Sequence, residues 1–178
     1  MGSRLALVVG AIAVAALSSG TVIAAPPDVE HSRLIATCGS WNVELTFKFQ
    51  PAAPPIVVKG TSTIEPLFNG TFIQETIRGV LNGVPFTTMA WTGFNTATRQ
   101  YEATRIATTN TARIAETGTY DESAGELQLK AEYQLAGDTW HQRTVIKILS
   151  PDAMLATSYL SFGAVPEWKA VEIKYARQ

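Results

Sequence analysis

WNVELTFKF, residues 41–49, gives the clearest indication of the fold class. Its odd-numbered residues are all hydrophobic, and its even-numbered residues are all polar or charged. Because successive side chains of a β-strand point to opposite faces, this period of two predicts a strand with one apolar and one polar face. LQLKAEYQL, residues 127–135, repeats the pattern in the second half of the chain.

Turn residues separate these two runs from further strand-like segments. We expect strands over residues 57–65, 72–80, 86–94, 99–108, 113–120, 140–149, 154–162 and 168–176. Asn82-Gly83 between two such segments is a strong hairpin signal, because both residues tolerate a positive φ. About ten strands at intervals of roughly 8–12 residues are typical of an antiparallel sandwich or barrel. No segment has the length or the helical period of a crossover helix, which argues against a parallel sheet.

Only residues 28–37 look helical. Asp28 can cap the N-terminus, Glu30 lies in the first turn, where the helix dipole favours an acid, and Gly39 can end the helix. We expect this helix to plug or cover one end of an up-and-down barrel. Closure of the barrel also removes the exposed strand edges that invite aggregation.

The N-terminus has the pattern of a signal peptide. Arg4 provides a positive charge, residues 5–17 are an uncharged apolar run, and Val22–Ala25 fits the small-x-small rule of a signal-peptidase site. The run is shorter than the ~20 apolar residues of a comfortable membrane span. A retained N-terminal anchor is the alternative interpretation.

We therefore expect a signal peptide over residues 1–24 and a single β-barrel domain over residues 25–178. Cleavage after Ala24 is favoured over cleavage after Ala25, because the latter leaves proline at the first mature position. The expected product is exported, either periplasmic or secreted, and has no stable membrane span once the signal is removed.

The composition excludes several classes of partner. Without residues 1–24 the chain has 13 basic and 15 acidic residues and no basic block, so nucleic acid is not an expected partner. One cysteine cannot form an internal disulfide, and with two distant histidines it makes no metal cluster. No cofactor is expected, and the sequence makes no prediction of the oligomeric state.

Short motifs spread over the whole mature chain resemble one family. The opening Pro27-x-x-Glu30-His31-x-x-Leu34 is followed by Gly39-x-Trp41. Further matching residues are Gly60, Leu67-Phe68-Asn69-Gly70-Thr71-Phe72, Pro85-Phe86, Gly93-Phe94-Asn95 with Tyr101, and Gly118-Thr119-Tyr120-Asp121. The pattern is similar to bacterial domain of unknown function family 1579, often exported proteins with a calycin-like (lipocalin-like) β-barrel. The resemblance implies fold and export, but no chemistry.

The sequence departs from the family pattern at several polar positions. Phe94 and Asn95 stand where such proteins usually have Tyr and Asp, and Arg105 and Ala107 stand where a Trp and an Asp usually follow the tyrosine. A function tied to those family side chains is therefore not expected here.

Arg105 and Glu116 are the main candidates for a binding site. If Asn110-Thr111 is a two-residue turn, Arg105 faces Glu116, and it shares the inward face with Tyr101. A charge inside a barrel is costly unless it is paired or hydrated. Arg105 could therefore orient a carboxylate ligand, as happens in fatty-acid-binding barrels, or form a structural ion pair.

The remaining candidates are aromatic residues and the two histidines. Six aromatic side chains could line an apolar cavity or fill it as core: Trp41, Phe47, Trp91, Trp140, Tyr159 and Trp168. The candidate ligand-binding set is Arg105, Glu116, Tyr101, Trp91 and His31; no catalytic or metal-binding residue is assigned.

Two further hypotheses, a nucleophilic pair that includes His31 and a haem site that includes His141, rank lower. His31 and Cys38 are two helical turns apart, so a thiolate–imidazole pair is conceivable, but we expect Cys38 to pack and His31 to cap or to form hydrogen bonds near the end of the barrel. A haem-binding barrel needs an inward histidine, whereas the alternation around His141 places it on the outer face.

The sequence thus favours an exported calycin-like barrel that binds a small hydrophobic or amphipathic ligand without catalysis. The alternative is a structural or partner-binding envelope protein with a filled barrel. A barrel enzyme, an isomerase or a hydrolase, ranks third, because no catalytic signature stands out.

Overall fold

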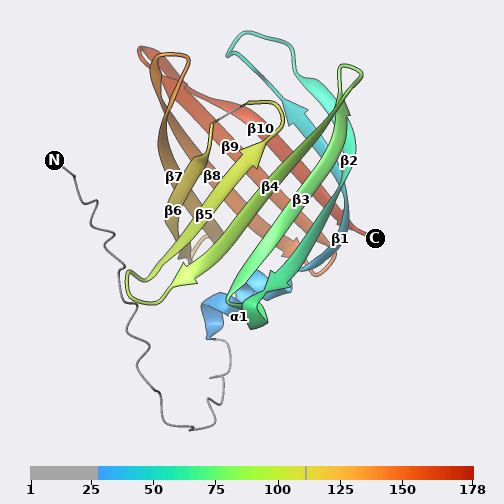
Figure 1. Ribbon diagram of the computed structural model, residues 1–178, viewed down its shortest axis with the longest axis vertical. Helices are drawn as coiled ribbons and strands as arrows, with labels where there is room; N and C mark the ends of the chain where they lie inside the picture. The colour runs from blue at the N-terminus through green and yellow to red at the C-terminus, as the bar shows by residue number, and fades with distance from the viewer. Residues whose placement is uncertain (1–27, 111) are drawn as a thin grey trace, which may run out of the picture.

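Ten antiparallel strands close into a barrel, and one short helix covers its end (Figure 1). The computed structural model describes residues 28–110 and 112–178, so the expected signal peptide lies outside the described residues. The elements are α1 (Val29–Ala36), β1 (Gly39–Phe47), β2 (Ile56–Leu67), η1 (Phe68–Gly70), β3 (Phe72–Leu81), β4 (Val84–Asn95), β5 (Gln100–Ala107), β6 (Ile114–Asp121), β7 (Glu126–Leu135), β8 (Asp138–Ser150), β9 (Ala153–Phe162) and β10 (Val165–Arg177).

Each strand pairs with its neighbours in sequence, and β1 closes the barrel by pairing with β10. In that last pairing Trp41 lies opposite Arg177, and Phe47 lies opposite Val171. The predicted up-and-down topology is confirmed, because the strand order around the barrel follows the chain without a crossover.

The alternation of β1 confirms the prediction made from its sequence. Trp41, Val43 and Leu45 are buried, while their polar neighbours lie on the outer face. The strand begins earlier than expected, at Gly39, and ends at Phe47, so Phe49 lies past its end and is exposed.

Residues in the left-handed region form the tight hairpin turns. Asn82 and Gly83 have φ values of 53° and 81°, which confirms the predicted β3–β4 turn. The β7–β8 turn is formed by Ala136 and Gly137, with φ values of 54° and 90°.

The expected two-residue turn at Asn110-Thr111 is wrong. β5 ends at Ala107 and β6 begins at Ile114, so a longer connection joins them. As a result Arg105 lies opposite Ile114, and Glu116 lies opposite Ala103. The register differs from the expected one by two residues, and since the side-chain period is also two, Arg105 and Glu116 keep the predicted inward face.

The helix α1 begins and packs as its sequence indicates. The Asp28 carboxylate accepts a hydrogen bond from the backbone N–H of His31 at 3.0 Å, which caps the N-terminus. Leu34 is buried against the barrel interior, and Trp41 Nε1 donates to the carbonyl of Thr37 at 3.0 Å. These contacts hold α1 across the end of the barrel near β3 and β4.

No helix in residues 28–110 and 112–178 has the length and the apolar character that a membrane span requires.

Candidate functional site

The barrel encloses a cavity of about 440 Å³. It extends from Leu34 and Thr37 at α1 to Phe49 and Asn110 beyond the strands at the other end. Inward side chains of most strands form its walls, which are mainly apolar: Leu45, Ile73, Ile77, Phe86, Ile114, Leu127, Leu129, Met154 and Ile173. This is the size and the lining of a small-molecule site, since such pockets are concave, mostly apolar and about 300–1,000 Å³ in volume.

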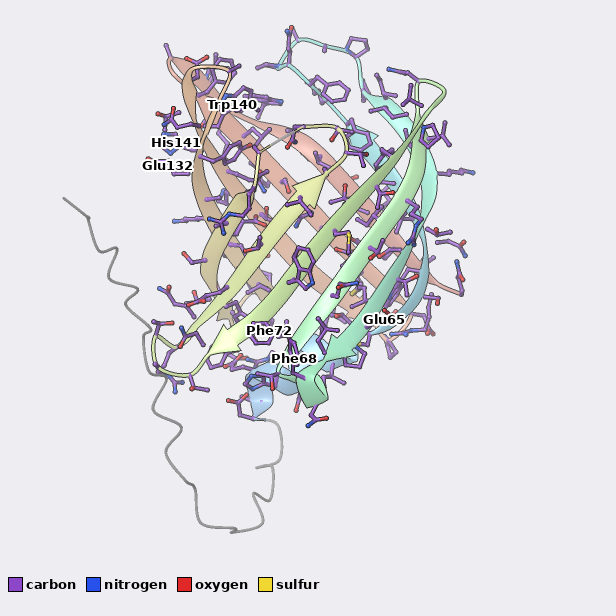
Figure 2. All side chains as sticks on the ribbon, in the orientation of Figure 1. Glu65, Phe68, Phe72, Glu132, Trp140 and His141 are labelled. Atoms are coloured by element: carbon purple, nitrogen blue, oxygen red, sulfur yellow. The ribbon has the colours of Figure 1, made fainter. Side chains whose placement is uncertain are left out.

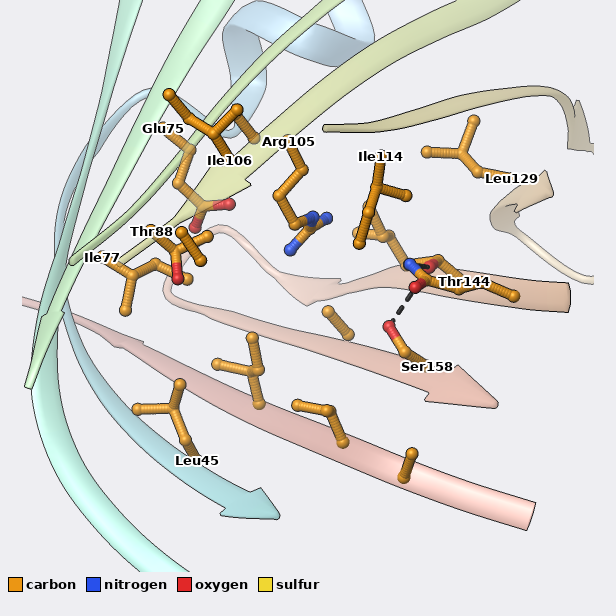
Figure 3. Close-up of a pocket in the computed structure, with 18 of the residues that line it drawn as sticks. Leu45, Glu75, Ile77, Thr88, Arg105, Ile106, Ile114, Leu129, Thr144 and Ser158 are labelled. Atoms are coloured by element: carbon orange, nitrogen blue, oxygen red, sulfur yellow. Dashed lines mark hydrogen bonds between the residues drawn. The ribbon is translucent and has the colours of Figure 1, made fainter. Parts of the chain in front are cut away.

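Arg105 projects into this cavity from β5, as Figure 3 shows. Its side chain is 21% exposed, and because the residue lines the cavity, that exposure is to the cavity space. Nη2 lies 3.6 Å from Glu116 Oε2, an ion-pair distance too long for a hydrogen bond. Within the described part of the chain, Arg105 makes no hydrogen bond, and its Nε is buried without a partner.

Glu116 is fixed behind the cavity wall by two donors. Its side chain is 0% exposed, and Oε1 accepts hydrogen bonds from Gln142 Nε2 at 3.0 Å and from Thr144 Oγ1 at 2.7 Å. Thr144 is linked in turn to Ser158 at 3.1 Å. Both Gln142 and Thr144 therefore act as donors to Glu116 Oε1.

A second carboxylate, Glu75 on β3, faces the same cavity. Glu75 Oε1 accepts hydrogen bonds from Ser62 Oγ at 2.8 Å and from Tyr175 OH at 2.9 Å. Burial and the neighbouring Glu75 charge hold the pKa of Tyr175 well above its usual range, so Tyr175 stays a donor.

The two carboxylates also act on Arg105. Burial opposes its positive charge, but Glu116 and then Glu75 favour it more strongly, so the pKa of Arg105 lies above its ordinary value. Arg105 is therefore a permanent cation with free donors in a largely apolar cavity.

Tyr101 shares the inward face with Arg105 but does not line the cavity. It is 1% exposed and lies under α1, where its hydroxyl donates a hydrogen bond to Glu30 Oε2 at 2.5 Å. Burial and the nearby Glu30 carboxylate raise the pKa of Tyr101. Tyr101 thus joins the barrel to its helix.

Trp91 points away from the cavity. The inward positions of β4 are Thr88, Ala90 and Thr92, and Trp91 lies between them on the outer face, where its Nε1 donates to Gln74 Oε1 at 2.9 Å. The expectation that Trp91 contributes to an internal site is therefore wrong in placement, because its alternation opposes that of Ala90.

The other aromatic candidates are divided between the cavity wall and other surroundings. Phe47 and Trp140 line the cavity. Trp41 packs edge-on against Tyr175, and Trp168 packs in a cluster with Trp140. Tyr159 does not line the cavity, and the Arg143 guanidinium lies 4.0 Å from its ring centre.

His31 lies beside the end of the barrel and outside the cavity lining. Its Nδ1 is 2.7 Å from the Asp28 carboxylate, and its ring contacts the ring of Phe94 edge-on. Cys38 Sγ lies 4.0 Å from the Leu34 carbonyl, and burial raises the pKa of its thiol. Among the described hydrogen bonds, none joins His31 to Cys38, so the thiolate–imidazole pair is not formed.

His141 lies on the outer face, as its alternation predicts. Its side chain is 58% exposed, and Nδ1 is 3.5 Å from Glu132 Oε2; both residues point outward in Figure 2. It therefore cannot serve as an axial ligand to a haem in the cavity. In the described ranges, no group of three or more metal-ligating side chains is placed to hold a metal ion.

Several polar residues of the cavity are not among the sequence candidates, including Glu75, Gln142, Thr144 and Tyr175. Glu75 was detectable, because it shares its alternation with Ile73 and Ile77 and is thus an acid in an apolar stripe. Gln142 and Thr144 acquire their role only from Glu116, which is distant in sequence.

Fold and cavity together define a lipocalin-like, calycin-type β-barrel with an internal cavity. A family model described as "Protein of unknown function (DUF1579)" matches residues 26–177, and the chain belongs to that family. Among curated proteins, no match to the sequence was found.

Two solved structures share the fold. Rv2717c from M. tuberculosis is 13% identical, with a TM-score of 0.61 over 84% of this chain and 98% of its own. The S-type phycobiliprotein lyase CPES from Guillardia theta is 11% identical, with a TM-score of 0.56 over 85% of this chain and 98% of its own. At these low sequence identities, the similarity to the two structures supports the fold alone.

Proposed function

We propose that this protein binds a small hydrophobic or amphipathic molecule inside the barrel, without catalysis. The observation that carries the proposal is the cavity of about 440 Å³ with Arg105 inside it and without a hydrogen-bonding partner in the described chain. Apolar walls would bury the body of the ligand, and the guanidinium would fix its polar end.

The structural neighbours are compatible with this role. The phycobiliprotein lyase named above has the same barrel architecture. This similarity of fold is compatible with the binding of a small molecule inside the barrel. The alternative, a structural envelope protein with a filled barrel, is less compatible with a cavity of this volume. We further propose that the protein is exported, on the basis of the signal-peptide pattern of residues 1–24.

Native mass spectrometry of the purified protein, followed by solvent extraction, tests the binding role. We expect a bound small molecule, and a fluorescent apolar probe should compete with it. Ala156→Phe places a ring in the cavity and should abolish probe binding, because Ala156 lines the wall. Leu155→Phe is the matched control on the opposite face of β9. An empty barrel that binds no apolar probe but co-purifies with another chain would favour a partner-binding protein.

A further inference from the structure

Three charged side chains surround the polar part of the cavity. Glu75 and Arg105 line it directly, and Glu116 lies behind Arg105 with its Oε2 at 3.6 Å from Nη2. Together they carry one positive and two negative formal charges. Lys48, the other charged residue along the described lining, follows the end of β1 at the rim, where solvent screens its charge.

Glu75 and Arg105 face each other across an alanine. In the strand register Glu75 lies opposite Ala90, and Ala90 lies opposite Arg105. The two charged residues therefore occupy one row across β3, β4 and β5, roughly 10 Å apart at the backbone. Because Ala90 between them carries only a methyl group, a gap remains into which both long side chains project (Figure 3).

The two sides of this gap have opposite hydrogen-bonding capacity. Arg105 offers only donors. Its Nη2 faces Glu116 Oε2 at 3.6 Å, no hydrogen bond of the described residues starts from Arg105, and the exposed part of its side chain opens to the cavity. Glu75 uses Oε1 for Ser62 and Tyr175, while its Oε2 takes part in no hydrogen bond of the described chain. The gap therefore presents free donors on one side and a free acceptor on the other.

We propose, building on the ligand-binding function above, that the cavity selects a neutral head group that both accepts and donates hydrogen bonds, such as a carboxamide or a lactam. Its carbonyl oxygen accepts from Arg105, and its N–H donates to Glu75 Oε2. This differs from the carboxylate that the isolated Arg105 suggests.

A carboxylate ligand meets two penalties in this gap. It adds a third negative charge to an interior that already holds two against one guanidinium, and buried like charges are costly. It also has no donor for Glu75. An alkylammonium would balance the excess negative charge, but its own charge approaches Arg105 and it has no acceptor for the guanidinium.

The test compares three ligands with the same alkyl chain: decanamide, decanoate and decylamine, each competing with a fluorescent apolar probe at neutral pH. We expect decanamide to bind at least about tenfold more tightly than either charged analogue. Tighter binding of decanoate or decylamine overturns the inference and leaves ligand binding intact. Equal affinity for all three ligands would show that the cavity does not discriminate between the head groups, and this result also overturns the inference.

A charge-removing variant tests the cause of the selectivity. Glu75→Gln retains an acceptor for Ser62 and Tyr175 and should raise decanoate affinity by about tenfold or more. Glu44→Gln removes the same charge from the outer face, where Glu44 pairs with Lys174, and should leave the preference unchanged. Unaltered decanoate binding in Glu75→Gln overturns the inference. If neither the probe nor any of the three ligands binds the wild type, the proposed function itself fails.

Discussion

Arg105 and Glu116 form an ion pair inside the barrel although they are not opposite each other in the sheet. Nη2 and Oε2 are 3.6 Å apart, while the strand register places Ile114 opposite Arg105 and Ala103 opposite Glu116. The pair is therefore diagonal across β5 and β6, within reach of long side chains. The contact directs Nη2 toward Glu116, while the exposed part of the Arg105 side chain opens to the cavity.

Removing one member of this pair should cost much more than removing both. Arg105→Leu leaves the Glu116 carboxylate buried and unpaired, and we expect a loss of about 3 kcal/mol in the free energy of unfolding. Arg105→Leu with Glu116→Gln should recover most of that loss, because no isolated charge remains and the glutamine side-chain oxygen can still accept from Gln142 and Thr144. Urea unfolding of the two single variants and the double variant measures the coupling; additive effects would show that the pair is energetically independent.

The role of Arg105 in ligand binding is tested without leaving a buried charge. Arg105→Gln combined with Glu116→Gln removes both charges and should weaken decanamide binding by about tenfold, since the charge-assisted hydrogen bond is lost. Trp91→Phe alters an aromatic residue on the outer face of β4 and should leave affinity unchanged. Isothermal titration at neutral pH gives both affinities; wild-type affinity in the double variant would assign Arg105 a purely structural role.

Tyr101 should make the protein sensitive to alkali. Burial and then Glu30 raise its pKa above the ordinary value near 10, so the folded state keeps a proton that the unfolded state loses above about pH 10. Stability is therefore fully present below that pH and falls as the pH rises further. The decline should be shallower in Tyr101→Phe.

The same variant should already be less stable at neutral pH. The loss of a hydrogen bond to a carboxylate corresponds to about 1.5 kcal/mol. Unfolding free energies at several pH values give both quantities. Tyr133 and Tyr175 also have raised pKa values, so part of the slope remains. Parallel profiles for the wild type and Tyr101→Phe would contradict this assignment.

Gly118 is required by the close approach of β6 and β7. A Cβ at this position would overlap the backbone carbonyl oxygen of Gln128, and a backbone atom cannot rotate away. We expect Gly118→Ala to lower the unfolding free energy by about 2 kcal/mol. The neighbouring Thr117→Ala, on the exposed face, should change it by no more than about 0.5 kcal/mol. Thermal and urea unfolding compare the two.

Cys38 should be dispensable. Its thiol packs beside the Leu34 carbonyl at the junction of α1 and β1, and burial raises its pKa, which disfavours the reactive thiolate. Cys38→Ser should therefore fold and bind the probe like the wild type, and the wild-type thiol should react slowly with a thiol reagent at neutral pH. Loss of probe binding with intact folding would assign Cys38 to the site.

The sequence predicts much of the candidate site in outline, and the two errors concern the β5–β6 turn and Trp91. Alternation places Arg105 and Glu116 inward and His141 outward, and the structure agrees. The β5–β6 turn differs from the expected one, but the register shift is two residues, which leaves every side chain on its predicted face. Trp91 is different, because its segment has apolar residues at both parities, Phe86 and Ala90 on one and Met89 and Trp91 on the other, so alternation alone does not assign its face.

The approximate strands, the faces of most side chains and the helix capped by Asp28 follow from the sequence alone. These features depend on local periodicity and turn chemistry, which are present within a few residues. The tertiary structure alone decided that a cavity remains between the walls and that Glu75 lies across it from Arg105. The physical reason is that cavity volume and charge pairing depend on the closure and register of strands distant in sequence, and a row such as Glu75, Ala90 and Arg105 exists only once three strands are aligned.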